Sequence, residues 1–333
     1  MEITYSINMD SNQLQNIIPL PSLWENLEIL EKRLYEVTIS EDPYLTEISQ
    51  YLIQAGGKRF RPLIALLSGE LGSGDKEKVI DAGISVELIH LGSLYHDDVI
   101  DEATTRRGVE STNRKWNATL AILAGDYLLA RSSELAADNL GLESVKLLAS
   151  TYAELVVGQT KEVQFSFNTT HSTDDYLEVI GGKTASLIRT SAKLGAMASD
   201  CNSNVTEAIS SWAWHNGIIF QITDDILDLN SDSETLGKPA GNDILEGTYT
   251  LPVLLALEKN PKKIEEILQR VKNSELELSA VLNEFNNDEI IEESNKFVNY
   301  HFKKSNEAIK NIENKEISDI LNNLNEYLLQ RSN

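Results

Sequence analysis

The chain has 333 residues, of which 41% are hydrophobic and 24% charged, and this composition is typical of a globular protein with a sizeable core. Its 52 acidic and 29 basic residues give a net charge of -23, which disfavours a nucleic-acid partner and permits at most peripheral membrane contact. The single cysteine excludes an intramolecular disulfide, and no apolar stretch reaches the roughly 18 residues that a membrane-spanning helix needs. We therefore expect a cytoplasmic protein.

Helical periodicity dominates the middle of the chain. All seven prolines lie outside residues 63–238, so long helices can run there unbroken. Within that stretch apolar residues recur at spacings of three and four, first over residues 84–95 and then over residues 147–156. Because alternation with a period of two is hard to find, the pattern predicts an all-α fold.

Short polar clusters predict where these helices end. The clusters lie at residues 72–75, 139–141, 168–173 and 200–204. From Ile309 to Leu324 apolar residues keep helical spacing among many Asn, Glu and Lys residues, which predicts surface helices and not disorder. We expect one domain over residues 1–333, with residues 1–20 as a loosely ordered extension.

Two copies of the pattern D-D-x-x-D are the sharpest chemical signal. They occupy residues 97–101 and 224–228, and each follows an apolar helical segment. Residues four apart share a helix face, so the first and last Asp of each copy form a column of hard oxygen ligands. Mg²⁺ fits such a column, because it takes few carboxylates and completes its shell with water and phosphate oxygens. A solvated acidic face is the alternative, and the acidic pair within residues 172–175 is better interpreted as a helix N-cap.

Basic residues gather close to the acidic motifs although the chain is acidic overall. Residues 56–62 contain Lys58, Arg59 and Arg61, and later positions add Arg106, Arg107, Lys183 and Lys238. Arginine binds phosphate oxygens through paired hydrogen bonds, so these residues predict anionic ligands held between metal and guanidinium groups. The alternative is charge balance with nearby Asp and Glu at the surface, which we favour for Arg59. Neither Gly-Gly-Lys sequence has the pattern of a nucleotide-binding loop.

Taken in order, the motifs resemble those of the trans-isoprenyl diphosphate (polyprenyl) synthases over residues 56–255. The matching segments are residues 56–62, 87–90, 97–101, 106–108, 125–126, 183–184, 220–228, 237–239 and 250–252. The resemblance implies a large single-domain helical bundle in which two Asp-rich helices face each other across a deep central cavity. It also implies a 1′-4 condensation of isopentenyl diphosphate with an allylic diphosphate, either farnesyl or geranylgeranyl diphosphate.

The resemblance also implies roles for individual residues. Those implied to be catalytic are Asp97, Asp98, Asp101, Arg106, Lys183, Asp224, Asp225 and Lys238. Mg²⁺, with three ions per active site, would be bound by Asp97, Asp101, Asp224 and Asp228. Isopentenyl diphosphate would contact Lys58, Arg61, His90 and Arg107, and the allylic diphosphate would contact Arg106, Lys183, Thr184, Gln221 and Lys238. For His90, and for Phe220 in the allylic site, packing in the core is the alternative.

Product length depends in this family on residues upstream of the first acidic motif. Gly92 lies five residues before Asp97, about 7.5 Å along a helix, and Ser93 beside it is also small. The cavity would therefore pass Gly92 and narrow only near Ile89, so we expect a product of C30 or longer, with C35 as the best guess. Two alternatives stay open: Gly92 serves only helix packing, or Tyr95 turns inward and restricts the cavity.

One departure from the family and several alternatives remain. The family often has Lys where this chain has Thr248, so one pyrophosphate contact is missing. The alternatives are a geranylgeranyl or farnesyl diphosphate synthase of the same family, a terpene cyclase and a non-catalytic regulatory subunit. We expect a homodimer, or a heterodimer with a small non-catalytic subunit, and a product used for a quinone side chain.

Overall fold

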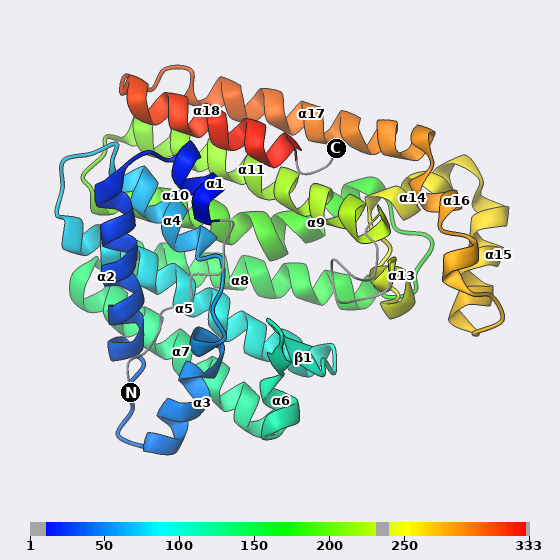
Figure 1. Ribbon diagram of the computed structural model, residues 1–333, viewed down its shortest axis with the longest axis horizontal. Helices are drawn as coiled ribbons and strands as arrows, with labels where there is room; N and C mark the ends of the chain where they lie inside the picture. The colour runs from blue at the N-terminus through cyan, green and yellow to red at the C-terminus, as the bar shows by residue number, and fades with distance from the viewer. Residues whose placement is uncertain (1–10, 231–239, 331–333) are drawn as a thin grey trace. The chain divides into compact units, whose positions relative to one another are not determined.

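The structure is a computed structural model that describes residues 11–230 and 240–330 (Figure 1). The longer helices are α2 (Pro21–Val37), α3 (Pro43–Gln54), α4 (Phe60–Gly69), α5 (Lys76–Ile100), α7 (Ala118–Asn139), α8 (Leu142–Phe165), α10 (Ser186–Ala198), α11 (Ser203–Asn230), α15 (Pro261–Lys272), α17 (Asp288–Ile309) and α18 (Lys315–Gln330). The shorter ones are α1 (Ser11–Ile17), α6 (Thr112–Lys115), α9 (Thr173–Ile180), α13 (Asn242–Glu246), α14 (Leu251–Lys259) and α16 (Asn283–Asn286), with a π-helical turn at Gly181–Ala185 and a 3₁₀ turn at Leu278–Ala280. Strands β1 (Thr105–Arg106) and β2 (Val109–Glu110) form one antiparallel hairpin. The predicted all-α fold is confirmed.

The helix ends also follow the sequence prediction. The cluster at residues 72–75 falls between α4 and α5, and the other three lie at helix ends, where they overlap the last residue of α7, the first residue of α9 and the first two residues of α11. Ser172 caps α9 with a capping box: its hydroxyl accepts from the Asp175 amide, while the Asp175 carboxylate accepts from the Ser172 amide. The N-cap interpretation of this acidic pair is confirmed.

The chain divides into two compact units, of which the first comprises Met1–Tyr152, Leu187–Ser210 and Ile312–Ile320. Within it α5 packs against α7, α4 and α2 (Figure 1). Side chains on all sides of α5 are buried along most of its length, and most of them are apolar, as expected of a helix surrounded by others. The first acidic motif lies at the C-terminal end of this buried helix.

The second unit comprises Ala153–Ser186, Ser211–Asn311 and Leu321–Asn333. Its core includes Ile222 and Ile226 of α11 together with Leu251 of α14, none of which is exposed. Helix α14 packs against α15, α16 and α17. The second acidic motif therefore lies on a helix whose other side is anchored in the core of this unit. The prediction of a single domain over the whole chain stays a prediction.

Both ends of the described chain are helical. Residues 11–20, expected within a loosely ordered extension, instead contain α1, because Leu14 and Ile18 bury their side chains. The C-terminal prediction is confirmed, since α17 and α18 bury the apolar residues from Ile309 to Leu324.

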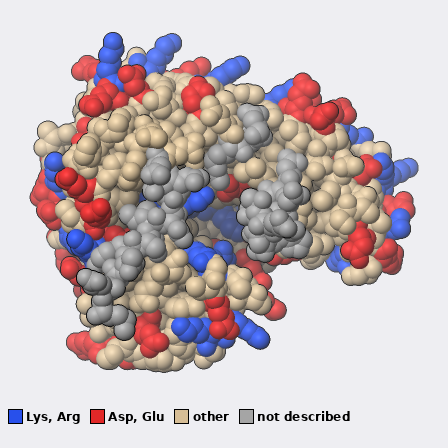
Figure 2. All heavy atoms as spheres, viewed as in Figure 1, with Lys and Arg blue, Asp and Glu red and all other residues tan. Residues whose placement is uncertain are grey.

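The surface carries side chains of both charges although the chain is acidic overall. On the face shown in Figure 2, Asp and Glu are interspersed with Lys and Arg and do not form one uniform acidic patch. Over residues 11–230 and 240–330, no helix is both long and apolar enough to cross a membrane.

Candidate active site

The basic motif at residues 56–62 turns sharply into α4, and Arg59 at the start of this helix is buried. Its backbone is left-handed, with a φ of 46°. Its guanidinium donates to both carboxylate oxygens of Glu31, at 2.6 and 2.7 Å, and to Glu87 at 3.1 Å. Charge balance for Arg59 is confirmed, but it takes place in the interior, where Arg59 is 3% exposed, and not at the surface as expected.

Sequence analysis missed Glu31 as the main partner of Arg59. Glu31 follows Leu27 by four residues and therefore lies on the buried apolar side of α2. A charged residue at a position where helical spacing calls for an apolar one was the available signal, because a buried charge needs a partner.

The β1–β2 hairpin holds Arg107 in place. Arg106 pairs with Val109, which leaves Arg107 and Gly108 as a two-residue loop. Both loop residues have positive φ, 53° and 76°, as a type I′ turn requires. Nη1 of Arg107 donates to the Leu52 carbonyl at 2.9 Å and also to the Gly56 carbonyl, so the hairpin is tied to the basic motif.

Gly57 lets the two arginines approach each other. A Cβ at this position would lie 2.9 Å from the Arg107 guanidinium and 2.9 Å from Nη1 of Arg59. Real Cβ atoms do not come that close, so any other residue would push one guanidinium away. The Gly-Gly pair thus sets the spacing of the basic cluster.

Arg61, His90 and Arg107 share an environment rich in positive charge. Burial lowers the pKa of Arg61 to about 10, with repulsion from Arg107 adding to the effect. Burial, and then the neighbouring guanidinium groups, hold the pKa of His90 well below its usual range, so the imidazole is neutral. Nε of Arg61 is a buried donor with no hydrogen-bond partner among the described residues. A cluster of this kind can bind an anion, and Lys58 beside it is exposed.

In the first acidic motif, two of the three Asp residues are accessible to solvent. Asp101 is exposed at the C-cap of α5 and Asp97 is half-buried one turn earlier. Asp98 has no exposed surface, and its Oδ1 accepts from Nε and Nη2 of Arg106, both at 2.6 Å. Asp98 therefore fixes the hairpin that carries Arg106. The predicted role of Arg106 in binding the allylic diphosphate stays a prediction.

In the second acidic motif, too, the middle Asp is buried and the outer two are more accessible. Asp224 and Asp228 are half-buried, whereas Asp225 is 4% exposed. Oδ2 of Asp225 accepts from the Tyr176 hydroxyl at 2.6 Å, and Oδ1 accepts from the Gln221 amide at 2.8 Å. Burial raises the pKa of Asp225 well above its usual range, and repulsion from Asp243 adds to the effect.

Two neighbours of this motif were missed by sequence analysis. Asp243, on α13, lies close enough for its charge to act on Asp225 and on Tyr176. In the sequence, only its place between the motifs at residues 237–239 and 250–252 pointed to it. Tyr176 gave no sequence signal apart from the apolar spacing of α9, because its partner lies 49 residues away.

Lys183 and Thr184 lie in the π-helical turn, a feature often found at functional sites. Lys183 forms an ion pair with Glu162, and the Thr184 hydroxyl donates to Oε1 of Gln221 at 2.8 Å. The structure thus brings Thr184, Gln221 and Asp225 together. Phe220 packs against the core of the second unit, which supports the packing alternative.

The donor set fits Mg²⁺. Asp97 and Asp101 are one helical turn apart, linked by the Asp101 amide donating to the Asp97 carbonyl at 2.8 Å, and Asp224 and Asp228 are spaced in the same way on α11. No group of three or more His, Cys, Asp or Glu residues that could bind a metal is found in the described parts of the chain. That is compatible with Mg²⁺, which usually takes one or two carboxylates, several waters and substrate phosphates.

Gly92 packs against α7. A Cβ there would lie 3.0 Å from the Gly125 carbonyl oxygen and 3.2 Å from Cγ of Leu129, which supports the helix-packing alternative. The Tyr95 hydroxyl donates to the Ile48 carbonyl at 2.5 Å, so this side chain is directed toward α3. The chain-length roles of Gly92, Ser93 and Ile89 stay predictions.

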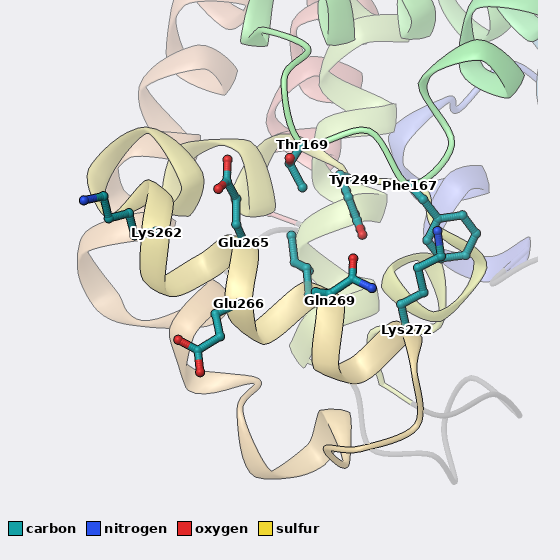
Figure 3. A pocket seen from close by; sticks show the side chains of 9 residues that line it. Phe167, Thr169, Tyr249, Lys262, Glu265, Glu266, Gln269 and Lys272 are labelled. Atoms are coloured by element: carbon teal, nitrogen blue, oxygen red, sulfur yellow. The ribbon is translucent and has the colours of Figure 1, made fainter.

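The segment around Thr248 borders a cavity of about 470 Å³ in the second unit. Its walls are Lys262, Glu265, Glu266, Leu268, Gln269 and Lys272 of α15, with Phe167, Thr169 and Tyr249 opposite (Figure 3). The Phe167 amide donates to the Gly247 carbonyl at 2.8 Å, and the Thr248 amide donates to the Asp243 carbonyl at 2.8 Å. None of the predicted site residues lines this cavity, and the predicted Lys238 lies outside the described residues.

Comparison with known proteins decides the family. A protein-family model for "Polyprenyl synthetase" matches residues 42–285, which is most of the chain. The chain belongs to the polyprenyl synthetase family. The resemblance seen in the motifs is confirmed, and the enzyme class is prenyltransferase.

Individual relatives in this family are similar to the chain in sequence or in structure. Heptaprenyl diphosphate synthase component 2 of Bacillus subtilis is 37% identical over 81% of this chain and 78% of its own length. Nonaprenyl diphosphate synthase of Mycobacterium tuberculosis is 45% identical over 66% of this chain and 65% of its own length. The crystal structure of a decaprenyl diphosphate synthase from Rhodobacter capsulatus is 28% identical, with a TM-score of 0.88 over 97% of this chain and 99% of the other.

Proposed function

We propose that this polyprenyl synthase condenses isopentenyl diphosphate with farnesyl or geranylgeranyl diphosphate into an all-trans polyprenyl diphosphate of C30 or longer, for a quinone side chain. The observation that carries the proposal is the basic cluster of Arg61, His90 and Arg107 beside the first acidic motif. The names of the relatives, heptaprenyl, nonaprenyl and decaprenyl diphosphate synthases, support a long product.

In this proposal the two substrates bind to different residues. Isopentenyl diphosphate is held by Lys58, Arg61, Arg107 and the neutral His90. Nε of Arg61 lacks an acceptor within the described residues, and a diphosphate oxygen would supply one. The allylic diphosphate is held by Arg106, Lys183, Thr184, Gln221 and Lys238.

The reaction starts when pyrophosphate leaves the allylic substrate. Mg²⁺, held by Asp97, Asp101, Asp224 and Asp228, would neutralise the negative charge that develops on the leaving group. Lys183 adds a positive charge near the same oxygens, and the Gln221 amide and Thr184 hydroxyl direct their dipoles at the allylic cation. Apolar side chains around the site would keep water away from this cation. The double bond of isopentenyl diphosphate then attacks it, and the released pyrophosphate takes up the proton that is lost.

The direct test is a product assay. Purified chain is incubated with farnesyl diphosphate, labelled isopentenyl diphosphate and Mg²⁺, and product length is measured by chromatography. We expect a product of C30 or longer, with C35 as the best guess, and no product in excess chelator. A product of C20 or shorter would refute the long-chain assignment, and incorporation of no label would refute the proposed reaction.

Substrate assignment can be tested by Michaelis constants. Lys58→Ala or Arg61→Ala should raise KM for isopentenyl diphosphate about tenfold more than KM for the allylic substrate, because each cation is assigned to one anion. Lys238→Ala should do the reverse. Lys146→Ala, which removes an exposed lysine paired with Glu143, is the control and should change neither constant. Equal effects on both substrates would contradict the assignment.

Assembly forms the last part of the proposal. The chain works as a homodimer or as the catalytic half of a heterodimer with a small non-catalytic subunit. Ile122 and Leu123 on α7 are 42% and 52% exposed, and a protein interface would cover such side chains. Light scattering after size exclusion gives the mass of the purified chain. A monomer without activity would support the heterodimer, whereas an active dimer would support the homodimer.

A further inference from the structure

Four side chains form a continuous series of hydrogen bonds inside the second unit. The Tyr176 hydroxyl donates to Oδ2 of Asp225 at 2.6 Å, and Nε2 of Gln221 donates to Oδ1 of the same carboxylate at 2.8 Å. The Thr184 hydroxyl then donates to Oε1 of Gln221 at 2.8 Å. Helix α9, the π-helical turn and α11 are thereby joined through polar atoms that water scarcely reaches, since Tyr176 is 5% exposed, Asp225 4% and Thr184 7%.

This series fixes the orientation of the Gln221 amide. The hydrogen bonds place Nε2 against Oδ1 of Asp225 and Oε1 against the Thr184 hydroxyl, which is the arrangement that an ionised Asp225 requires because a carboxylate only accepts hydrogen bonds. The reverse orientation would place Oε1 against the carboxylate and leave two acceptors facing each other. Tyr176 supplies the second donor to Asp225, and this donor keeps the plane of the carboxylate in place for Gln221.

Orientation matters because Gln221 lies beside Thr184 and Lys183, at the proposed allylic site. A carbonyl oxygen directed at a developing cation stabilises it, whereas an amide N–H in the same place repels it. Dipoles that are already oriented before the reaction stabilise a transition state without reorganisation. An amide that can turn over therefore lowers the rate of ionisation and has little effect on the binding of isopentenyl diphosphate.

We propose that Tyr176 is a positioning residue for the condensation, which acts through Asp225 to hold Gln221 in the orientation that stabilises the allylic cation. The inference rests on the proposed function. Tyr176 reaches the reacting atoms only through two other side chains, so it is not itself a catalytic residue. Its isosteric variant Tyr176→Phe removes the hydroxyl and keeps the ring that packs in the core.

The first measurement compares kcat and KM in the variants. Tyr176→Phe should lower kcat about tenfold, with KM for isopentenyl diphosphate within twofold of wild type. Tyr127→Phe is the matched control: it also removes a hydroxyl that donates to one acceptor, the Ile39 carbonyl at 2.9 Å, but in the first unit, and it should leave kcat unchanged.

A double-mutant cycle separates positioning from a general structural effect. Gln221→Leu should lower kcat, and adding Tyr176→Phe to it should lower kcat no further, because the residue through which Tyr176 acts is already gone. Losses that multiply would overturn the inference. Gln221→Glu keeps Tyr176 and places an acceptor against Asp225, so it should lose at least as much activity as Gln221→Leu. Higher activity in Gln221→Glu would also overturn it.

The outcomes also separate this inference from the proposed function. If the wild-type chain incorporates no isopentenyl diphosphate, the proposed function and the inference both fail. If the wild type is active and folded Tyr176→Phe retains full kcat, the inference fails alone. Circular dichroism at the assay temperature verifies that each variant is folded.

Discussion

The two D-D-x-x-D motifs have the same pattern but different partners for their middle Asp. Both middle residues are withdrawn from solvent, Asp98 completely and Asp225 to 4% exposure. Asp98 is paired with the guanidinium of Arg106, whereas Asp225 is held by a hydroxyl and an amide, with the negative charge of Asp243 nearby. In both motifs the first and last Asp are accessible to solvent, while the middle Asp is buried. Partners from outside the motif then determine how the buried carboxyl group is compensated.

The charged residues near the two motifs also differ. Next to the first motif, Arg61 and Arg107 are crowded cations whose pKa values are lowered by burial. Next to the second, the pKa of Asp225 is raised by burial and by a neighbouring acid. The buried neighbours of the first motif are therefore crowded cations, whereas the buried Asp of the second motif has an acidic neighbour. The first three predictions below test this difference, and the last concerns a histidine pair elsewhere in the second unit.

The largest effect is expected from removing the buried cation of the first unit. Arg59→Met leaves Glu31 and Glu87 buried without their partner, which should lower the free energy of unfolding by about 3–5 kcal/mol. Urea unfolding measures this loss. Lys58→Met changes the exposed neighbour and should cost less than about 0.5 kcal/mol. Similar losses in the two variants would show that the buried pairing is unimportant.

The presented Asp residues should behave alike in the two motifs. Asp97→Ala and Asp224→Ala should each lower kcat by on the order of 10²-fold, equivalent to about 2.7 kcal/mol in activation free energy, while the fold survives. Asp138→Ala, an exposed Asp on α7, is the control. Steady-state kinetics and circular dichroism give both quantities. Near-normal turnover in either variant would break the functional equivalence of the motifs.

The buried Asp residues, by contrast, should behave differently. Asp98→Asn removes the charge that balances Arg106, and we expect the free energy of unfolding to fall by about 2 kcal/mol. The loss is smaller than for a fully buried pair, because the Arg106 side chain is 30% exposed. In Asp225→Asn the hydrogen-bond partners, the Tyr176 hydroxyl and the Gln221 amide, carry no charge. This variant should therefore lower the free energy of unfolding by less than about 1 kcal/mol. Denaturant unfolding of both variants tests the comparison. A larger loss of stability in Asp225→Asn than in Asp98→Asn would contradict this prediction.

The smallest effect concerns a histidine pair in the second unit. Nδ1 of His215 lies 2.9 Å from Nδ1 of His301, and burial lowers the pKa of His301 to about 4, with His215 adding repulsion. Between pH 6.5 and 4 the unfolded chain therefore binds a proton that the folded chain does not, so the free energy of unfolding falls as the pH falls. We expect a loss of about 1 kcal/mol from pH 7 to pH 5, after allowing for solvent screening.

The matched variants are His301→Asn, which should remove this part of the pH dependence, and His171→Asn, which should keep it. Urea unfolding at pH 7 and pH 5 gives the difference for each. Identical pH dependence in His301→Asn and the wild type would contradict the assignment.

Sequence reasoning predicted what is local and missed what is brought together by folding. Helix ends and the Ser172 cap follow from spacing and from short polar clusters, so they could be predicted. The partners of Glu31, Tyr176 and Asp243 could not, because each residue meets its partner only after distant helices pack. The interior position of Arg59 was missed for the same reason. A basic motif indicates an anion site, but the pairing of each cation is decided by helices elsewhere in the chain.

The close approach of Gly92 to α7 leaves little room for a side chain at the position that is predicted to set product length. Any side chain at this position would have its Cβ 3.0 Å from a main-chain oxygen, and a main-chain atom cannot move aside as a flexible side chain can. A single substitution toward a shorter product would therefore be disfavoured by instability before its effect on the product could be selected. Natural or laboratory lineages would have to shift α7 first, or change the product through another position.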